Sequence, residues 1–517
     1  MKQLRIILLL SGILCSGVSA LANVILPSIF SSGMVLQRNA PIPVWGKAAP
    51  GEKIIVKFNG QELQSIVGDD SLWRVDLPAT HEGGPYTMTI AGSDTLVLTN
   101  VLVGEVWICS GQSNMEFTLA KSIDADKDIP EANHSDIRLF LIKRKVADEP
   151  QFTCEAKWEA CTPASVKNFS AVAYYFGRRL QELLNVPVGL VQATWGGTPA
   201  ECWTSREALE SNKELLPILE KWREDLARYP EAKKRYDEEL PRVSAEWETA
   251  AAKARATGEA APPRPQEPRG PGSRNTPSGQ FNAMISPIAS YAMKGVIWYQ
   301  GEANASRAYQ YRTLFPAMIA DWRKHWGAGD FPFYFVQLPN LKRGPEPSKS
   351  GWAELREAQL MTLSLPNTGM AVTIDIGDST DLHPTNKKPV GLRLARIAEA
   401  LLYGQSETEY SGPTYKSKTV EGEKMRIAFD HVGGGLVARG NEPLAGFTIA
   451  GSDKVFHTAE ARIDGDEVVV SSSRVANPVS VRYAWADNPN CNLYNKDGLP
   501  ASPFRTDDWP EVTFSKR

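Results

Sequence analysis

The chain has 517 residues, 42% of them hydrophobic and 23% charged, and its 57 Lys and Arg against 60 Asp and Glu give a formal net charge of −3. This near-neutral charge excludes binding to nucleic acid or to an acidic membrane by bulk electrostatics. The length exceeds the roughly 250–300 residues that one hydrophobic core supports, so we expect two or three domains.

The first 22 residues show the three parts of a secretory signal peptide. Residues 1–5 are basic, residues 6–14 are apolar, and residues 20–22 are the small-residue pattern of a cleavage site. The apolar run is shorter than the stretch of about 20 residues that a membrane-spanning helix needs. We therefore expect cleavage after Ala22, export to the periplasm or the medium, and no membrane insertion of the mature chain.

The cysteines and histidines give no sign of a metal site. The sequence contains no CxxC and no HExxH pattern, and its six histidines are scattered. Five cysteines remain beyond the signal peptide. Cys154 and Cys161 could close a small loop or remain thiols, and the spacing does not decide between these alternatives.

Residues 23–103 are expected to form an N-terminal β-sandwich. Short apolar strands alternate with turn signals, among them Asn59-Gly60 between the candidate strands 54–58 and 73–77. Repeated short strands at this spacing are typical of a sandwich.

Residues 104–409 show the alternation of strands and longer helices that predicts a mostly parallel α/β sheet with helices on both faces. Buried strands are expected at 106–109, 189–191, 295–299, 333–336 and 371–374. A charge-rich helical insertion is expected at about 205–275, either as a surface element or as a lid over an active site. Residues 410–517 return to β character.

Chemistry in an open α/β sheet is expected beyond the carboxyl ends of its strands. A Ser110-to-Met115 segment follows the first strand, and two glycines, Gly196 and Gly197, follow the second. The third strand is followed by Gln300, and the last by an acidic segment that ends in His383. A candidate nucleophile, hydrogen-bond donors and an acid–His pair thus fall on successive strand ends of one sheet.

Elimination favours His383 as the catalytic base. His81, His431 and His457 lie in the β regions, His325 at a helix end and His134 in a polar loop. A lone histidine is more often structural than catalytic, but only His383 follows a sheet strand with acids beside it.

The segments GQSNM, TWGGTPAECW, WYQGEAN and DLHPTNK together resemble the conserved blocks of the sialate O-acetylesterase family, a branch of the SGNH hydrolases. The resemblance covers most of residues 24–517. It implies an SGNH-hydrolase-like, flavodoxin-like three-layer α/β domain with flanking β-sandwich segments.

The resemblance also implies roles for individual residues. Ser113 would be the nucleophile and His383 the general base. The oxyanion donors would be the backbone N–H of Ser113, a backbone N–H of Gly196 or Gly197, and the side-chain amide of Gln300. Asn114, Glu302 and Asn304, which neighbour these residues in the motifs, are expected to contact the substrate.

The sequence offers two candidates for the acid that orients His383. In the wider SGNH pattern it stands three residues before the histidine, where this chain has Thr380. Asp381 is our first choice and Asp378 the second, because a residue two positions away on an extended chain points to the same side. The alternative is that Asp381 only caps the following helix.

These observations predict an exported serine esterase that removes acetyl groups from the hydroxyls of a sugar, needing no cofactor or metal. Its partner would be an acetylated carbohydrate, either a plant polysaccharide such as xylan or xyloglucan, or sialic acid. The alternative is a secreted carbohydrate-binding protein with a degenerate hydrolase domain.

Overall fold

The computed structural model describes residues 23–257, 261–342, 350–440 and 442–516. The predicted signal peptide, residues 1–22, lies outside the described residues. Within the described residues no helix combines the length and the apolar character needed to cross a bilayer. The five cysteines of this part of the chain are unpaired thiols, so Cys154 and Cys161 are not joined.

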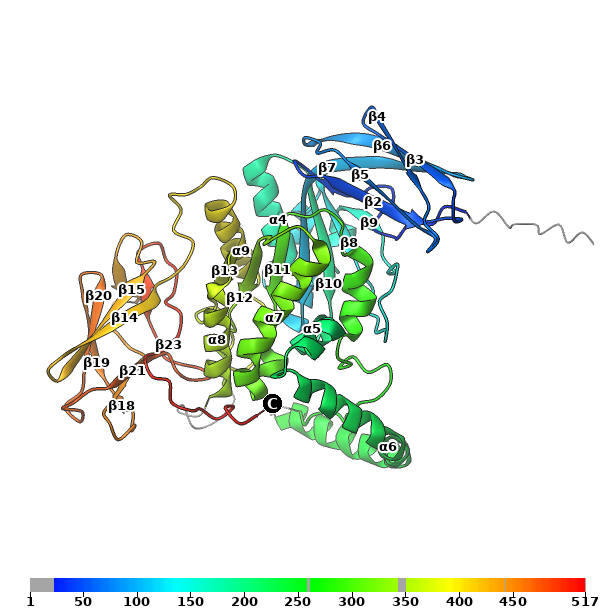
Figure 1. The fold of residues 1–517 in the computed structure, drawn as a ribbon. Helices are drawn as coiled ribbons and strands as arrows, with labels where there is room; N and C mark the ends of the chain where they lie inside the picture. Colours follow the sequence, from blue (N-terminus) through cyan, green and yellow to red (C-terminus); the bar gives the residue numbers. More distant parts are fainter. Residues whose placement is uncertain (1–22, 258–260, 343–349, 441, 517) are drawn as a thin grey trace, which may run out of the picture.

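A sheet of mostly parallel strands forms the centre of the molecule (Figure 1). Its strands in spatial order are β13 (Thr368–Ala371), β12 (Phe333–Val336), β11 (Gly295–Tyr299), β7 (Thr95–Gly111), β10 (Val188–Thr194), β8 (His134–Leu141) and β9 (Trp158–Cys161). Of these seven strands, only β9 runs antiparallel to its neighbour in this order. The predicted α/β fold is confirmed, although residues 372–374, expected in the last strand, lie beyond it because the partner strand β12 ends opposite Ala371.

Helices cover both faces of this sheet. The main ones are α4 (Ala171–Leu184), α7 (Ala308–Trp326), α8 (Gly351–Met361) and α9 (Lys388–Leu401). Trp107 of β7 packs edge-on against Phe176 of α4, and Trp298 of β11 stacks on Phe315 of α7. Because Trp107 pairs in register with Gly295, three residues before Trp298, the two tryptophans point to opposite faces. The result is the expected three-layer arrangement.

Local capping fixes where these helices begin and end. The Ser170 hydroxyl accepts a hydrogen bond from the N–H of Ala173 at 3.1 Å at the start of α4, and Asn185 ends that helix in the left-handed conformation. The shorter helices are α1 (Ser113–Glu116), α2 (Ala125–Glu131) and α3 (Pro163–Val166), with 3-10 turns at Leu119–Lys121, Ala200–Trp203, Ser286–Ile288, Glu302–Arg307 and Thr362–Ser364 and a π-helical turn at Phe281–Ile285.

The N-terminal β region is continuous with the α/β domain. It consists of β1 (Val35–Gln37), β2 (Ile42–Lys47), β3 (Lys53–Phe58), β4 (Gln61–Ile66), β5 (Leu72–Leu77) and β6 (Gly83–Ala91). β1 and β6 pair with β7, and a single hydrophobic core runs from Val24 to Ala398. The expected boundary between residues 103 and 104 therefore falls inside β7, which serves both parts.

The C-terminal β region has a hydrophobic core of its own. Its strands are β14 (Thr414–Glu421), β15 (Lys424–Asp430), β16 (Leu436–Ala438), β17 (Phe447–Ala450), β18 (His457–Thr458), β19 (Glu460–Asp464), β20 (Glu467–Ser471), β21 (Ser480–Tyr483), β22 (Leu493–Asn495) and β23 (Phe504–Arg505). They form two four-stranded sheets and a two-stranded one. Figure 1 shows this region and the N-terminal β region on opposite sides of the α/β domain.

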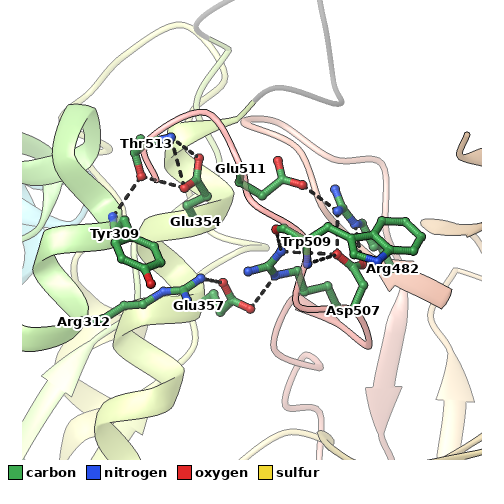
Figure 2. Close-up of polar contacts among 10 residues, drawn as sticks. Tyr309, Arg312, Glu354, Glu357, Arg482, Asp507, Trp509, Glu511 and Thr513 are labelled. Atoms are coloured by element: carbon green, nitrogen blue, oxygen red, sulfur yellow. Dashed lines mark hydrogen bonds and ion pairs between the residues drawn. The ribbon is translucent and has the colours of Figure 1, made fainter. Parts of the chain in front are cut away.

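Polar side chains fasten the end of the chain to the α/β domain (Figure 2). Arg505 of β23 pairs with Glu357 of α8 at 2.7 Å and with Asp507 at 3.2 Å. Farther along, the Thr513 hydroxyl donates to Glu354 of α8 at 2.6 Å. These contacts couple the C-terminal region to the helix that packs behind the 3-10 turn Glu302–Arg307.

The predicted insertion is helical. It contains α5 (Arg206–Ser211) and the long α6 (Leu216–Thr257), which projects away from the sheet in Figure 1. The Pro- and Arg-rich segment that follows runs back along α6, because Trp247 donates to the Pro262 carbonyl at 2.7 Å and Lys233 lies 3.7 Å from Glu267. The first turns of α6 therefore lie near the sheet and its later turns lie farther out.

Candidate active site

The predicted strand-end segments meet around one cavity of about 820 Å³. The central strands β10, β7 and β11 are parallel neighbours, so the residues that follow them emerge at the same edge of the sheet. Ser113, Gly196, Gly197, Glu302 and His383 all line this cavity. The segments that the sequence singled out are thus brought together.

The nucleophile position depends on a glycine at the end of β7. Gly111 has a φ of +138°, and a Cβ there would lie 2.2 Å from the Tyr299 carbonyl oxygen of β11. Only glycine permits this approach without displacing a strand. The chain then turns directly into α1, whose first residue is Ser113. Its side chain is thereby presented to the cavity from the end of a central strand.

Ser113 and His383 form a hydrogen-bonded pair. The distance between Ser113 Oγ and His383 Nε2 is 2.9 Å. Partial burial lowers the pKa of His383 from its usual 6.5, and the nearby Lys387 ammonium lowers it further. The imidazole is therefore neutral at neutral pH and can accept the hydroxyl proton.

Asp381 is the nearer of the two candidate acids, but it does not form the expected hydrogen bond. Its Oδ1 lies 3.9 Å from His383 Nδ1 and accepts from the backbone N–H of His383 at 2.8 Å. Asp378 Oδ1 instead accepts from the backbone N–H groups of Thr380 and Asp381 in a local turn. The carboxylate of Asp381 therefore acts on the imidazole through its charge, which raises the pKa of His383.

The glycine loop, the segment after β10 that contains Gly196 and Gly197, has one backbone N–H that is engaged and one that is not. The Gly196 N–H donates to Glu116 Oε2 at 2.9 Å, and Arg144 pairs with the other oxygen of that carboxylate. The N–H of Gly197, with φ of +76°, donates to no acceptor within the described residues. Of the two alternatives left by the sequence, Gly197 is the donor that this conformation leaves available.

Gln300 does not face the cavity. It is completely buried, its Nε2 donates to the Thr198 carbonyl at 3.3 Å and to Asn304 Oδ1 at 2.6 Å, and its Oε1 accepts from the Tyr311 hydroxyl at 2.9 Å. The expectation that this amide points at the reacting oxygen is not met, because the amide is used to join loops beneath the site.

Two of the three residues expected to contact substrate have structural positions instead. Asn114 is completely buried and bonds to Glu302 Oε1 at 2.5 Å and to the Leu382 carbonyl at 3.0 Å. Asn304 is also buried, and its Oδ1 accepts from the Ala200 N–H at 2.9 Å. Glu302 alone of the three lines the cavity. The sequence placed these residues at the correct strand ends but gave no information on which way each side chain points.

Lys387 is a residue of the site that the sequence did not single out. It is buried, its Nζ donates to Asn114 Oδ1 at 2.5 Å, and it lies 4.8 Å from the centre of the Phe117 ring. Burial lowers its pKa to about 7. Its place four residues after His383, inside the same motif, was the available signal.

The helical insertion supplies one wall of the cavity. Ile218, Lys221, Trp222 and Asp225 come from the first turns of α6, and Arg269 comes from the segment that runs back along it. The indole of Trp222 gives this wall a flat apolar face beside several charged groups. A wall of this composition suits a sugar, which presents both C–H faces and hydroxyls. No group of three His, Cys, Asp or Glu side chains in the described part of the chain could hold a metal ion.

Comparisons with known proteins agree with the geometry. Residues 274–401 match a family model described as carbohydrate esterase, sialic acid-specific acetylesterase. The chain is 30% identical to the sialate O-acetylesterase of Rattus norvegicus over 92% of this chain and 93% of the relative, and 33% identical to that of Mus musculus with the same coverage. A crystal structure of a carbohydrate acetylesterase from Xanthomonas citri superposes with a TM-score of 0.79 at 39% identity, covering 94% of this chain and 100% of the other.

Proposed function

The chain belongs to the sialate O-acetylesterase family, and we propose from this premise that Ser113 is the nucleophile of an exported enzyme that removes acetyl groups from sugar hydroxyls. Its similarity to sialate O-acetylesterases and to a carbohydrate acetylesterase identifies the chain as a carbohydrate O-acetylesterase. The observation that carries the residue assignment is the 2.9 Å contact between Ser113 Oγ and His383 Nε2 in the wall of the 820 Å³ cavity.

In the proposed reaction His383 Nε2 takes the proton of Ser113 as Oγ attacks the acetyl carbonyl carbon. The electron pair of the carbonyl moves to its oxygen, and backbone N–H groups at Ser113 and the glycine loop donate to that oxyanion. The tetrahedral intermediate collapses when the bond to the sugar oxygen breaks and His383 gives its proton to that oxygen. Water then releases acetate from Ser113 by the same steps in reverse.

The alternative of a non-catalytic carbohydrate-binding protein has less support. It requires the hydrolase domain to be degenerate, yet the serine and the histidine are within hydrogen-bond distance. Relatives that match 92% and 94% of this chain are esterases by name. A binding protein has no need of this contact.

The assignment is tested with Ser113→Ala. We expect the variant to fold like the wild type and to release no acetate from p-nitrophenyl acetate, because the attacking oxygen is removed. Turnover near that of the wild type would refute Ser113 as nucleophile.

Substrate choice requires a panel of acetylated sugars. Acetate release from acetylated xylan and xyloglucan fragments is compared with release from O-acetylated sialic acid, all at matched acetyl concentration. The value of kcat/KM ranks these substrates directly. A preference for the plant fragments would place the enzyme in polysaccharide degradation, and a preference for sialic acid would place it with its mammalian relatives' named substrate.

Export is tested separately on the protein recovered from its source cells. We expect the mature protein in the periplasm or the medium, with an intact mass that corresponds to a chain beginning at Asn23. A full-length chain retained in the cytoplasm would refute it.

A further inference from the structure

Gln300 and Gln112 are two glutamines near the nucleophile whose side-chain amides are bonded differently. Gln300 has both of its amide hydrogens engaged, with the Thr198 carbonyl and Asn304 Oδ1 as acceptors. A primary amide has two N–H bonds and no more. An oxyanion in the cavity would receive a hydrogen bond from Gln300 only if this buried network broke, which leaves the side-chain donor of the site to be found elsewhere.

Gln112 stands immediately before Ser113 and lines the cavity. Its Oε1 accepts from the backbone N–H of Ala303 at 3.2 Å and approaches that of Gly301 at 3.5 Å. Because backbone N–H groups can only donate, they fix which end of the amide is oxygen. Within the described residues Nε2 of Gln112 has no acceptor, so an unused donor remains beside the nucleophile.

The backbone holds Gln112 rigidly in this place. Its N–H donates to the Tyr299 carbonyl of β11 at 3.0 Å, and its carbonyl accepts from the N–H groups of Met115 at 3.0 Å and Glu116 at 2.9 Å. The residue is 2% exposed. A donor held from both its main chain and its side chain requires no reorganisation when charge develops on a nearby oxygen, which is the condition for strong electrostatic stabilisation.

Two backbone donors of the same cavity are also unused. Ser113 is the first residue of α1, so its N–H has no partner within that helix. The N–H groups of Ser113 and Gly197 donate to no acceptor in the described part of the chain. Gln112, Ser113 and Gly197 thus each keep a donor without an acceptor among the described residues, whereas the N–H of Gly196 donates to Glu116.

We infer that Gln112 Nε2 is the side-chain donor of the oxyanion hole, acting with the backbone N–H groups of Ser113 and Gly197. This inference rests on the proposed function, because it needs Ser113 to be the nucleophile. As Ser113 Oγ bonds to the acetyl carbon and its proton passes to His383, the carbonyl electron pair becomes the oxyanion that Gln112 binds. When the oxyanion reforms the carbonyl and the sugar oxygen leaves with the proton from His383, the hydrogen bond from Gln112 weakens again.

The test compares Gln112→Ala with Gln300→Ala, two removals of the same amide in the same neighbourhood. Gln112→Ala should lower kcat for p-nitrophenyl acetate about 10²–10³-fold with KM nearly unchanged, the usual loss for one oxyanion donor. Gln300→Ala should lower thermal stability more than Gln112→Ala does, and should leave kcat of the folded protein much closer to the wild type.

A nearly isosteric variant guards against misfolding as an explanation. Gln112→Glu keeps an oxygen for the N–H groups of Gly301 and Ala303 but presents a second oxygen to the cavity, so kcat should fall at least as far as in Gln112→Ala while the fold is kept. Inactivation by a p-nitrophenyl methylphosphonate, which leaves a tetrahedral anionic adduct on the nucleophile, should slow by a similar factor in both Gln112 variants.

The outcomes separate this inference from the proposed function. If Ser113→Ala stays active, the nucleophile assignment fails and the inference fails with it. If Ser113→Ala is inactive but Gln112→Ala keeps wild-type kcat and inactivation rate, only the role of Gln112 is overturned. A fall in kcat of folded Gln300→Ala as large as that of Gln112→Ala would likewise overturn it.

Discussion

The segments that carry Ser113 and His383 are held in different ways. Asn114, the residue after the nucleophile, is completely buried and bonds to Glu302, to the Leu382 carbonyl and to Lys387. In the segment that carries the histidine, 40% of the His383 side chain and 58% of the Asp381 side chain are exposed to solvent.

The range of the contacts differs as well. The bonds of Asn114 join segments that are 188 to 273 residues away in the chain. The carboxylates of Asp378 and Asp381 bond to backbone groups two or three residues away. The nucleophile segment is therefore fixed by buried side-chain bonds across the tertiary fold, whereas the two acids beside His383 bond only within a local turn. Substitution of Asn114, beside the nucleophile, should lower both the free energy of unfolding and kcat. Substitution of an acid beside His383 should lower kcat alone.

The largest effect is expected for Asn114→Ala. The substitution leaves the Lys387 ammonium, the Leu382 carbonyl and Glu302 Oε1 without the amide between them, and each buried group left unsatisfied costs about 1–3 kcal/mol. Because the amide also links the serine segment to the histidine segment, kcat should fall by about 10²-fold or more, as displacements near 1 Å do. Urea unfolding and p-nitrophenyl acetate turnover measure both.

Asp378→Ala is the matched control on the histidine side. Its carboxylate is exposed and bonds only within its own turn, so unfolding should be nearly unchanged, as for most surface substitutions. Equal losses of stability in Asn114→Ala and Asp378→Ala would show that the two sides are held alike.

A smaller effect on turnover is expected for Asp381→Asn. A buried aspartate that bonds to Nδ1 of the catalytic histidine is worth about 10⁴-fold in kcat, but here the two atoms are 3.9 Å apart and the carboxylate is half exposed. We therefore expect a loss of about tenfold, with unfolding unchanged, since charge alone acts across this distance. A loss near 10⁴-fold would mean that the turn closes on Nδ1 when substrate binds, and that the local turn is as decisive as the buried side.

The sequence predicted the backbone arrangement of the site better than its side chains. Strand periodicity and the four motifs placed Ser113, Gly197 and His383 at one sheet edge, since parallel strands end together. The direction of Gln300 was not predictable, because Gln112 and Gln300 are chemically identical and only the packing of the loops decides which amide is buried.

Long-range contacts account for the other differences. The role of Asn114 depends on Lys387 and Glu302, which are distant in sequence and meet it only in the folded chain. The domain boundary expected at 103/104 falls inside β7, because this strand runs without a break from the N-terminal sheet into the central sheet and is buried throughout its second half.

The smallest predicted effect is a pair of opposite shifts in the pH profile of kcat/KM. The base must be unprotonated, so activity falls as the pH drops through the pKa of His383, which burial and Lys387 hold below its usual 6.5. Lys387→Met removes a positive charge, so the pKa of His383 should rise and the acid limb should move to higher pH. Asp381→Asn removes a negative charge, so the limb should move to lower pH.

The contacts of Lys387 and Lys388 set the expected size of these shifts and supply a control variant. With its own pKa at about 7, above that of His383, Lys387 is mostly charged in the pH range of the acid limb. Each shift should be well under one pH unit, because a full unit corresponds to about 1.4 kcal/mol. Lys388→Met is the matched control, because Lys388 pairs with Asp128 at 3.3 Å. The charges that shift the pKa of His383 are those of Asp381, Lys387 and Lys121. If Lys387→Met and Lys388→Met moved the acid limb equally, the charge of Lys387 would have no specific effect on the pKa of His383. The bond from Lys387 to Asn114 would then only support the structure of the histidine segment.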